Sequence, residues 1–194
     1  MMKLIFLVLL WNCMEWNKFS MSNLRLISKQ SATSGVSSFS VTDVFSADFD
    51  IYKVVLEQQD YSADNNVYMR LINSSGSVIT ASEYDYAVHE LLSYNTFGEA
   101  RATNQNKWDK IIRGDAVTAS NGGAVYYFFN PYSSSSYTFQ LGQQAGASDG
   151  TVTILGKGIS VLTQLSSITG FQFTPGSGTI DTLVVSVYGL RVDS

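Results

Sequence analysis

Apolar and polar residues alternate with a period of two along most of the chain, which predicts β-strands with one buried face. In the segment 36–42, Phe39 and Val41 are expected on one face and Ser38 and Ser40 on the other. Runs of Gly, Ser, Asn and Asp, which favour turns, separate such segments. The pattern predicts nine or ten short strands, at 36–42, 51–56, 67–72, 77–80, 124–130, 137–141, 151–155, 159–162, 168–174 and 183–190.

These strands predict an all-β fold, an antiparallel, jelly-roll-like β-sandwich, because many short strands with frequent turns are typical of that class. Two parts of the pattern leave alternatives. The segment 87–92 fits a helical turn or a strand. The glycines of 156–158 fit a hairpin or one bent strand, and 168–190 is expected to form a terminal strand pair around the turn 175–178.

The composition narrows the function. Only 14% of the residues are charged and the net charge is −4, while Ser and Thr make up about a fifth of the chain. Binding of nucleic acid through phosphates needs clustered Lys and Arg, which this acidic chain lacks. The single Cys13 excludes a disulfide framework within the chain and a zinc site built from several thiolates.

The first twenty residues differ from the rest. Residues 4–10 are apolar and follow Lys3, as in a signal peptide, but they are too few to span a bilayer. The bulky residues 11–16 do not form a cleavage site, and a lipidated Cys13 would need small residues before it. The alternatives are a start at Met21, a signal or anchor, and a structural segment, so we expect a leader at 1–20 and one sandwich domain at 21–194.

Candidates for catalysis or metal binding are few, and we expect no enzyme, no metal and no cofactor. General acid–base catalysis needs a pair of titratable groups in a shared pocket, and calcium needs clustered oxygen ligands. Motifs such as Gly-x-Ser-x-Gly or His-Glu-x-x-His are absent from the sequence. Two acidic groups fit solvated edges and turns better than active sites: Glu83, Asp85, His89 and Glu90, and Asp43, Asp48 and Asp50.

Aromatic residues are the enriched resource, at 13% of the chain. Exposed aromatic rings provide a large contact area at low entropic cost, so they suit subunit interfaces or stacking on sugars. Four of them lie in or beside polar stretches and are the candidates for ligand or interface contacts: Tyr94, Trp108, Tyr132 and Tyr137.

Four landmarks resemble a family of virion-associated proteins of tailed bacteriophages, especially marine ones. The first is FSADFDIYKVVL at 45–56, followed by SEYDY at 82–86 and YYFFNPY at 126–132. The fourth runs from SITGFQF at 167–173 through GTI at 178–180 to VYGL at 187–190. The resemblance covers roughly 24–191 and rests on the order and spacing of these strand and turn patterns.

The resemblance implies a non-enzymatic structural component of a virion, either a tail fibre or adhesin for host attachment or a capsid decoration. By analogy it implies a homotrimer that contacts other virion proteins and, on a tail, a host-surface glycan, without nucleic acid or a membrane span. The expected location is the virion. The alternative is a secreted or surface-anchored carbohydrate-binding β-sandwich module, for which residues 1–20 would act as a signal.

Overall fold

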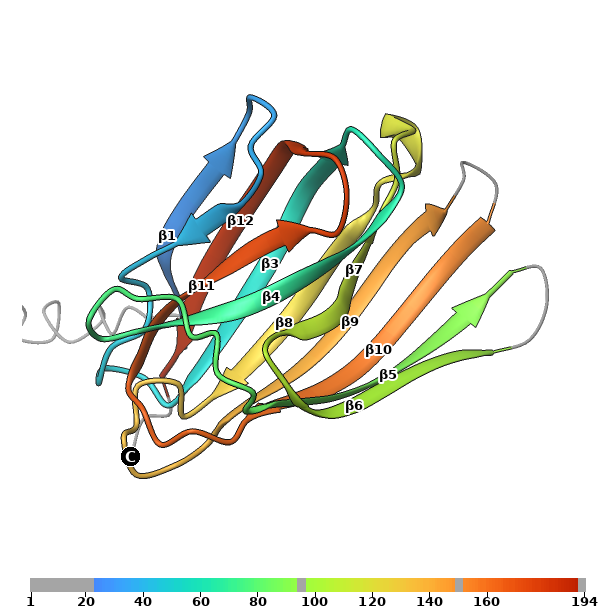
Figure 1. Cartoon of the computed structure of the whole chain (residues 1–194). Helices are drawn as coiled ribbons and strands as arrows, with labels where there is room; N and C mark the ends of the chain where they lie inside the picture. Colours follow the sequence, from blue (N-terminus) through green and yellow to red (C-terminus); the bar gives the residue numbers. More distant parts are fainter. Residues whose placement is uncertain (1–22, 94–96, 149–151, 192–194) are drawn as a thin grey trace, which may run out of the picture.

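The computed structural model describes residues 23–93, 97–148 and 152–191, which form two antiparallel β-sheets packed face to face (Figure 1). The larger sheet has eight strands, in the spatial order β1 (Leu24–Ala32), β12 (Ile180–Leu190), β3 (Ile51–Tyr61), β8 (Gly123–Phe129), β9 (Thr138–Ser148), β10 (Val152–Leu162), β5 (Tyr84–Leu92) and β6 (Gly98–Gln105). The smaller sheet has four, in the order β2 (Phe39–Val41), β11 (Ile168–Pro175), β4 (Asn65–Asn73) and β7 (Trp108–Gly114). One 3-10 turn, Thr118–Ser120, precedes β8.

The predicted antiparallel sandwich is confirmed, but the described residues form twelve strands instead of nine or ten. The pattern missed β1, β6 and β7. β1 and β6 are the two edges of the larger sheet, so their side chains are largely exposed and carry little alternation. β7 has bulged pairing with β4 and a left-handed residue, Lys110, at φ 53°, which breaks the period of two.

The structure decides the two open alternatives and corrects two other local predictions. The glycines of 156–158 lie within the unbroken ladder of β10, so they belong to a single strand and no hairpin forms there. The expected terminal pair is wrong, because β11 pairs with β2 and β4 while β12 pairs with β1 and β3 in the other sheet. The segment 77–80 contributes only an isolated bridge from Val78 to Ile72, whereas 87–92 belongs to strand β5.

The core between the sheets is aromatic. Phe128 of β8 stacks on Phe171 of β11 with ring centroids 5.7 Å apart, and Phe45 lies within 6 Å of both rings. Each of these rings is at most 3% exposed. Aromatic pairs at this spacing add packing energy to the burial of their large apolar area, so this cluster joins the two sheets.

Two buried tyrosines hydrogen-bond the backbone of the smaller sheet and its turn. The Tyr84 hydroxyl donates to the Ile79 carbonyl and accepts from the Leu71 amide, each at 3.0 Å. The Tyr126 hydroxyl donates to the Ile111 carbonyl at 2.9 Å. Burial raises the pKa of Tyr84 to about 12 and the pKa of Tyr126 well above its usual value, because the phenolate would lose its hydration.

The free edge of β7 rests on the larger sheet. Besides the Tyr126 contact, the Arg113 amide donates to Gln144 Oε1 at 2.8 Å, and the Trp108 indole N–H donates to the Val161 carbonyl at 3.0 Å. The Ile111 carbonyl and the Arg113 amide are thereby occupied, so β7 does not offer these two backbone groups to another chain.

Candidate interaction face

The side of the larger sheet that faces away from the smaller sheet carries the main candidate site. We call it the outer face and define it by four outward positions on each of five strands, β3, β8, β9, β10 and β5. They are Ile51, Lys53, Val55 and Glu57; Gly123, Val125, Tyr127 and Phe129; Phe139, Leu141, Gln143 and Ala145; Leu155, Lys157, Ile159 and Val161; and Asp85, Ala87, His89 and Leu91.

In β9 and β10 the usual polarity of a sandwich strand is inverted. Phe139 and Ile159 point outward and are 46% and 62% exposed, whereas Gln140 and Ser160 point inward and are buried. Alternation alone would place the apolar residues in the core. The ladder fixes the opposite arrangement, because these strands must also bury Ile154, Leu162 and the backbone beneath β7.

The register brings the outward apolar residues together across the sheet. Tyr127, Leu141 and Ile159 are direct cross-strand neighbours on β8, β9 and β10. The row on one side of them contains Phe129 and Phe139. Neighbouring side chains on one sheet face interact directly, so these residues form a continuous apolar surface instead of scattered exposed positions.

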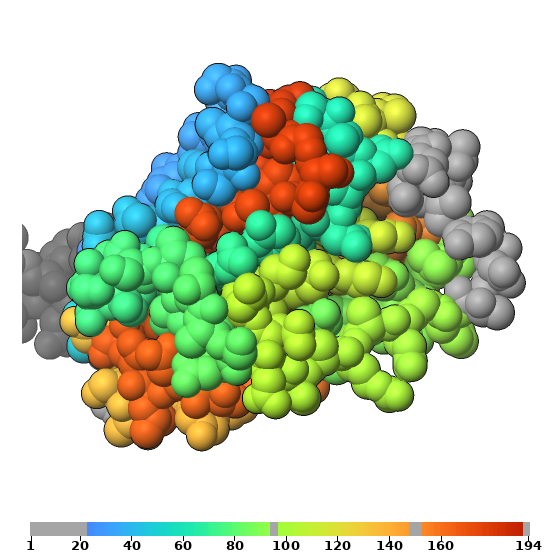
Figure 2. All heavy atoms as spheres, viewed as in Figure 1, coloured from blue at the N-terminus to red at the C-terminus, as the bar shows by residue number. Residues whose placement is uncertain are grey.

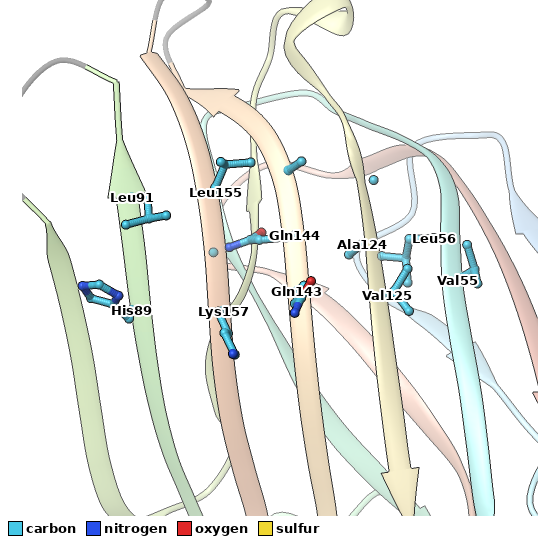
Figure 3. A pocket seen from close by; sticks show the side chains of 13 residues that line it. Val55, Leu56, His89, Leu91, Ala124, Val125, Gln143, Gln144, Leu155 and Lys157 are labelled. Atoms are coloured by element: carbon cyan, nitrogen blue, oxygen red, sulfur yellow. The ribbon is translucent and has the colours of Figure 1, made fainter.

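Two shallow hollows with mainly apolar linings lie on this face, beside a third that is lined by charged and polar side chains including His89, Glu99 and Arg101. One, of about 580 Å³, is lined by Val55, Val125 and Leu155 among others, and Figure 3 shows these side chains on β3, β8 and β10. The other, of about 520 Å³, lies beside Phe139 and Ile159. Their linings are mainly aliphatic and aromatic, so they fit apolar side chains better than a charged ligand.

The charges on the outer face balance. Lys53 and Lys157 oppose two carboxylates, Glu57 and Asp85, although the whole chain carries −4. Glu57 accepts hydrogen bonds from Lys29 of β1 and Ser186 of β12, and these bonds hold its pKa below the usual value. A neutral face allows two acidic copies of the chain to approach each other there without strong repulsion.

The size of the outer face suits a stable interface. Each outward residue covers about 32 Å² of sheet, given strands about 4.8 Å apart and alternate residues about 6.7 Å apart. The positions on five strands then cover about 640 Å², and extension over all eight strands gives about 1,000 Å². A standard interface buries about 800 Å² on each partner, so the five strands supply most of that area and the flanking strands would supply the rest.

The outward side of the smaller sheet is polar by comparison. Gln172 of β11 lies between Ser40 of β2 and Arg70 of β4, and its amide donates to Ser40 Oγ. The Tyr68 ring is covered by the Lys107 ammonium at 4.0 Å. Figure 2 is viewed from this side, where green and yellow-green segments that include β4 and β7 cover the middle of the molecule. This side therefore suits contact with solvent.

The four aromatic candidates from the sequence differ in their exposure and in whether the structure describes them. Trp108 is fully buried against Tyr84, so it is a core residue and its ring is not open to a ligand. Tyr132 and Tyr137 are exposed in the connection between β8 and β9. Tyr94 lies outside the described residues, as does the leader at 1–20. Of the three described rings, two are exposed and available for contacts.

The acidic groups do not converge on a site. His89 points outward on β5, whereas the neighbouring Glu90 is buried on the inner side near Arg113. Within the described ranges, no group of three or more His, Cys, Asp and Glu side chains is placed to hold a metal ion. No helix in that part of the chain combines the length and apolar character needed to cross a membrane.

Comparisons with known proteins give no family. No family model matches the chain, and no curated protein matches it. Among solved structures, the VP2 subviral particle of infectious bursal disease virus is matched at 10% identity and a TM-score of 0.14. That alignment covers 88% of this chain and 41% of VP2, so the chain spans less than half of the viral protein. At this TM-score the match carries no argument about fold or function.

Proposed function

We propose that this protein is a non-enzymatic structural component of a bacteriophage virion, a tail fibre or adhesin or a capsid decoration, that associates with further copies of itself through the outer face. The inverted polarity of β9 and β10 carries the proposal. An exposed Ile159 and Phe139 above a buried Gln140 and Ser160 are costly in an isolated subunit and favourable once a partner covers the face.

A second copy of the chain is the occupant that the face fits best. Its charges balance, its area reaches most of the about 800 Å² that a standard interface buries on each partner, and its two apolar hollows accept the apolar side chains that project from the same face. The phage resemblance supports the same class of function through its landmarks, which fall on β3, β5, β8, β11 and β12. A homotrimer and a face-to-face dimer would both bury this face.

The test is the native mass of the full chain, measured by light scattering during size-exclusion chromatography over a dilution series. Ile159→Glu places a charge in the centre of the outer face, where association would have to strip it of water. Leu165→Glu is the matched control, because Leu165 is 60% exposed in the connection after β10 and lies off the face.

We expect the wild type and Leu165→Glu to form the same oligomer and Ile159→Glu to dissociate at concentrations at least 100-fold higher. Circular dichroism of both variants shows whether the sandwich is retained. Monomers at every concentration, or equal association of the two variants, would contradict the proposal.

A further inference from the structure

The inward side of β9 and β10, beneath β7, carries a polar seam whose chemistry the outer face does not use. We define the seam by Gln140 and Gln144 of β9 and Ser160 of β10. Gln140 is 2% exposed and Ser160 is 5% exposed, and they are direct cross-strand partners. Polar side chains in this position are surrounded by the interior of the sandwich.

Glycines on the same strands create the space that the seam occupies. A Cβ atom at Gly142 would lie 2.6 Å from Gln140 Nε2, and one at Gly156 would lie 2.6 Å from Gln144 Nε2. Both distances are too short for a real contact, so any larger residue would displace the amides. Because these positions are glycine, the side-chain amides of Gln140 and Gln144 lie close against the backbone of the larger sheet, beneath β7.

The seam contains donors and acceptors with no partner among the described residues. They are Gln140 Nε2, Gln144 Nε2 and Ser160 Oγ, each hidden from bulk solvent. Gln144 uses only its Oε1 atom, which accepts from the Arg113 amide. Buried polar groups in native proteins nearly always have a hydrogen-bond partner. Gln140 and Ser160 are directly opposed, so their two unpartnered atoms indicate a bound species between them.

The size of the cavity identifies that species. The space between the seam and Lys110 and Ile111 of β7 has a volume of about 20 Å³. A buried water needs about 10–15 Å³ on the same scale and usually makes about three hydrogen bonds. A sugar ring or another organic ligand needs a pocket of about 300 Å³ or more, which this cavity does not approach.

We propose that one ordered water occupies this cavity and bridges β9 to β10 beneath β7. It accepts a hydrogen bond from the Gln140 side-chain amide and donates one to Ser160 Oγ. The water satisfies the polar groups that the inverted strands turn inward. It thereby lets β9 and β10 direct their apolar residues to the outer face and still pack against β7.

Two measurements on the full chain test the water. A crystal structure at about 1.5 Å should show one water oxygen about 2.6–3.2 Å from both Gln140 Nε2 and Ser160 Oγ. In solution, the Gln140 side-chain amide should show a nuclear Overhauser effect to water with the sign of a long-lived contact. Ser160→Ala should remove or weaken that signal at least several-fold, whereas Ser134→Ala, in the exposed β8–β9 connection, should leave it unchanged.

Three results would overturn the inference. The first is a dry cavity in which the Gln140 amide turns and bonds Ser160 directly. The second is an ion or a larger molecule in the density. The third is a water signal that is equal in wild type and Ser160→Ala. None of these would alter the native-mass result for the outer face, so the two proposals fail independently.

Discussion

Replacement of Gly142 by alanine tests how tightly the larger sheet is packed beneath β7. A Cβ at this position would lie 2.5 Å from Cδ1 of Tyr126 and 2.6 Å from Gln140 Nε2. The Tyr126 ring is 2% exposed and its hydroxyl is bonded to the Ile111 carbonyl, so it has to move by about 1 Å to restore ordinary van der Waals contact. Overpacking of this kind costs about 1–3 kcal/mol.

The displaced ring also weakens the Tyr126 hydrogen bond and leaves the buried Ile111 carbonyl poorly satisfied, at a further cost of about 1–2 kcal/mol. We therefore expect Gly142→Ala to lower the free energy of unfolding by about 2–5 kcal/mol. Urea denaturation followed by circular dichroism measures it, and with a slope of about 2 kcal/mol per molar the midpoint falls by about 1–2.5 M.

Gly146→Ala is the matched control in the same strand. Its Cβ would meet nothing closer than the Gly122 amide at 3.5 Å, which is an ordinary contact. The added methyl reduces the freedom of the unfolded chain, so we expect a change within about 1 kcal/mol, in the stabilising direction. Equal midpoints for the two variants would refute the packing argument at Gly142.

Two further predictions concern the buried tyrosines. Tyr84→Phe removes a hydroxyl that bonds both the Leu71 amide and the Ile79 carbonyl, whereas Tyr126→Phe removes one hydrogen bond to the Ile111 carbonyl. We expect the free energy of unfolding, measured by urea denaturation, to fall by about 2–4 kcal/mol for the first variant and about 1–2 kcal/mol for the second. A larger loss for Tyr126→Phe than for Tyr84→Phe would contradict these contacts. Burial raises the pKa of Tyr61, Tyr84 and Tyr126, so the unfolded chain loses these protons near pH 10 while the folded chain keeps them. Stability should stay level up to about pH 9.5 and then fall with rising pH, by up to about 1.4 kcal/mol per pH unit for each tyrosine, and phenolate absorbance of these three should develop only on unfolding.

The fold class could be predicted from the sequence because most strands with one buried face show the period of two. The pattern in β8 is typical, since Ala124, Tyr126 and Phe128 face the core. The edge strands were not predicted, because exposure on several sides removes the alternation of apolar and polar residues, as in β6 with its small and polar residues. The pairing partners of β11 and β12 could not be predicted, because alternation does not specify which sheet a strand joins.

The candidate site could not be predicted from the sequence for a related reason. In the segment 137–141 the pattern correctly separates Phe139 from Gln140, but it does not say which of the two faces inward. Only the ladder to β8 and β10 shows that the apolar set faces outward. The useful signal in the sequence was the set of small inward positions Gly142, Gly156 and Gly158, because a core face that lacks large side chains shifts the apolar residues to the opposite face.

The most direct test of the central claim is hydroxyl-radical footprinting of the full chain at concentrations below and above association, with residue-level mass spectrometry. We predict that oxidation of Tyr127, Phe139 and Ile159 falls several-fold on association, while that of Tyr132 and Leu165, which lie off the outer face, stays unchanged. Association that leaves the oxidation of the first three unchanged would show that the chain assembles through another surface.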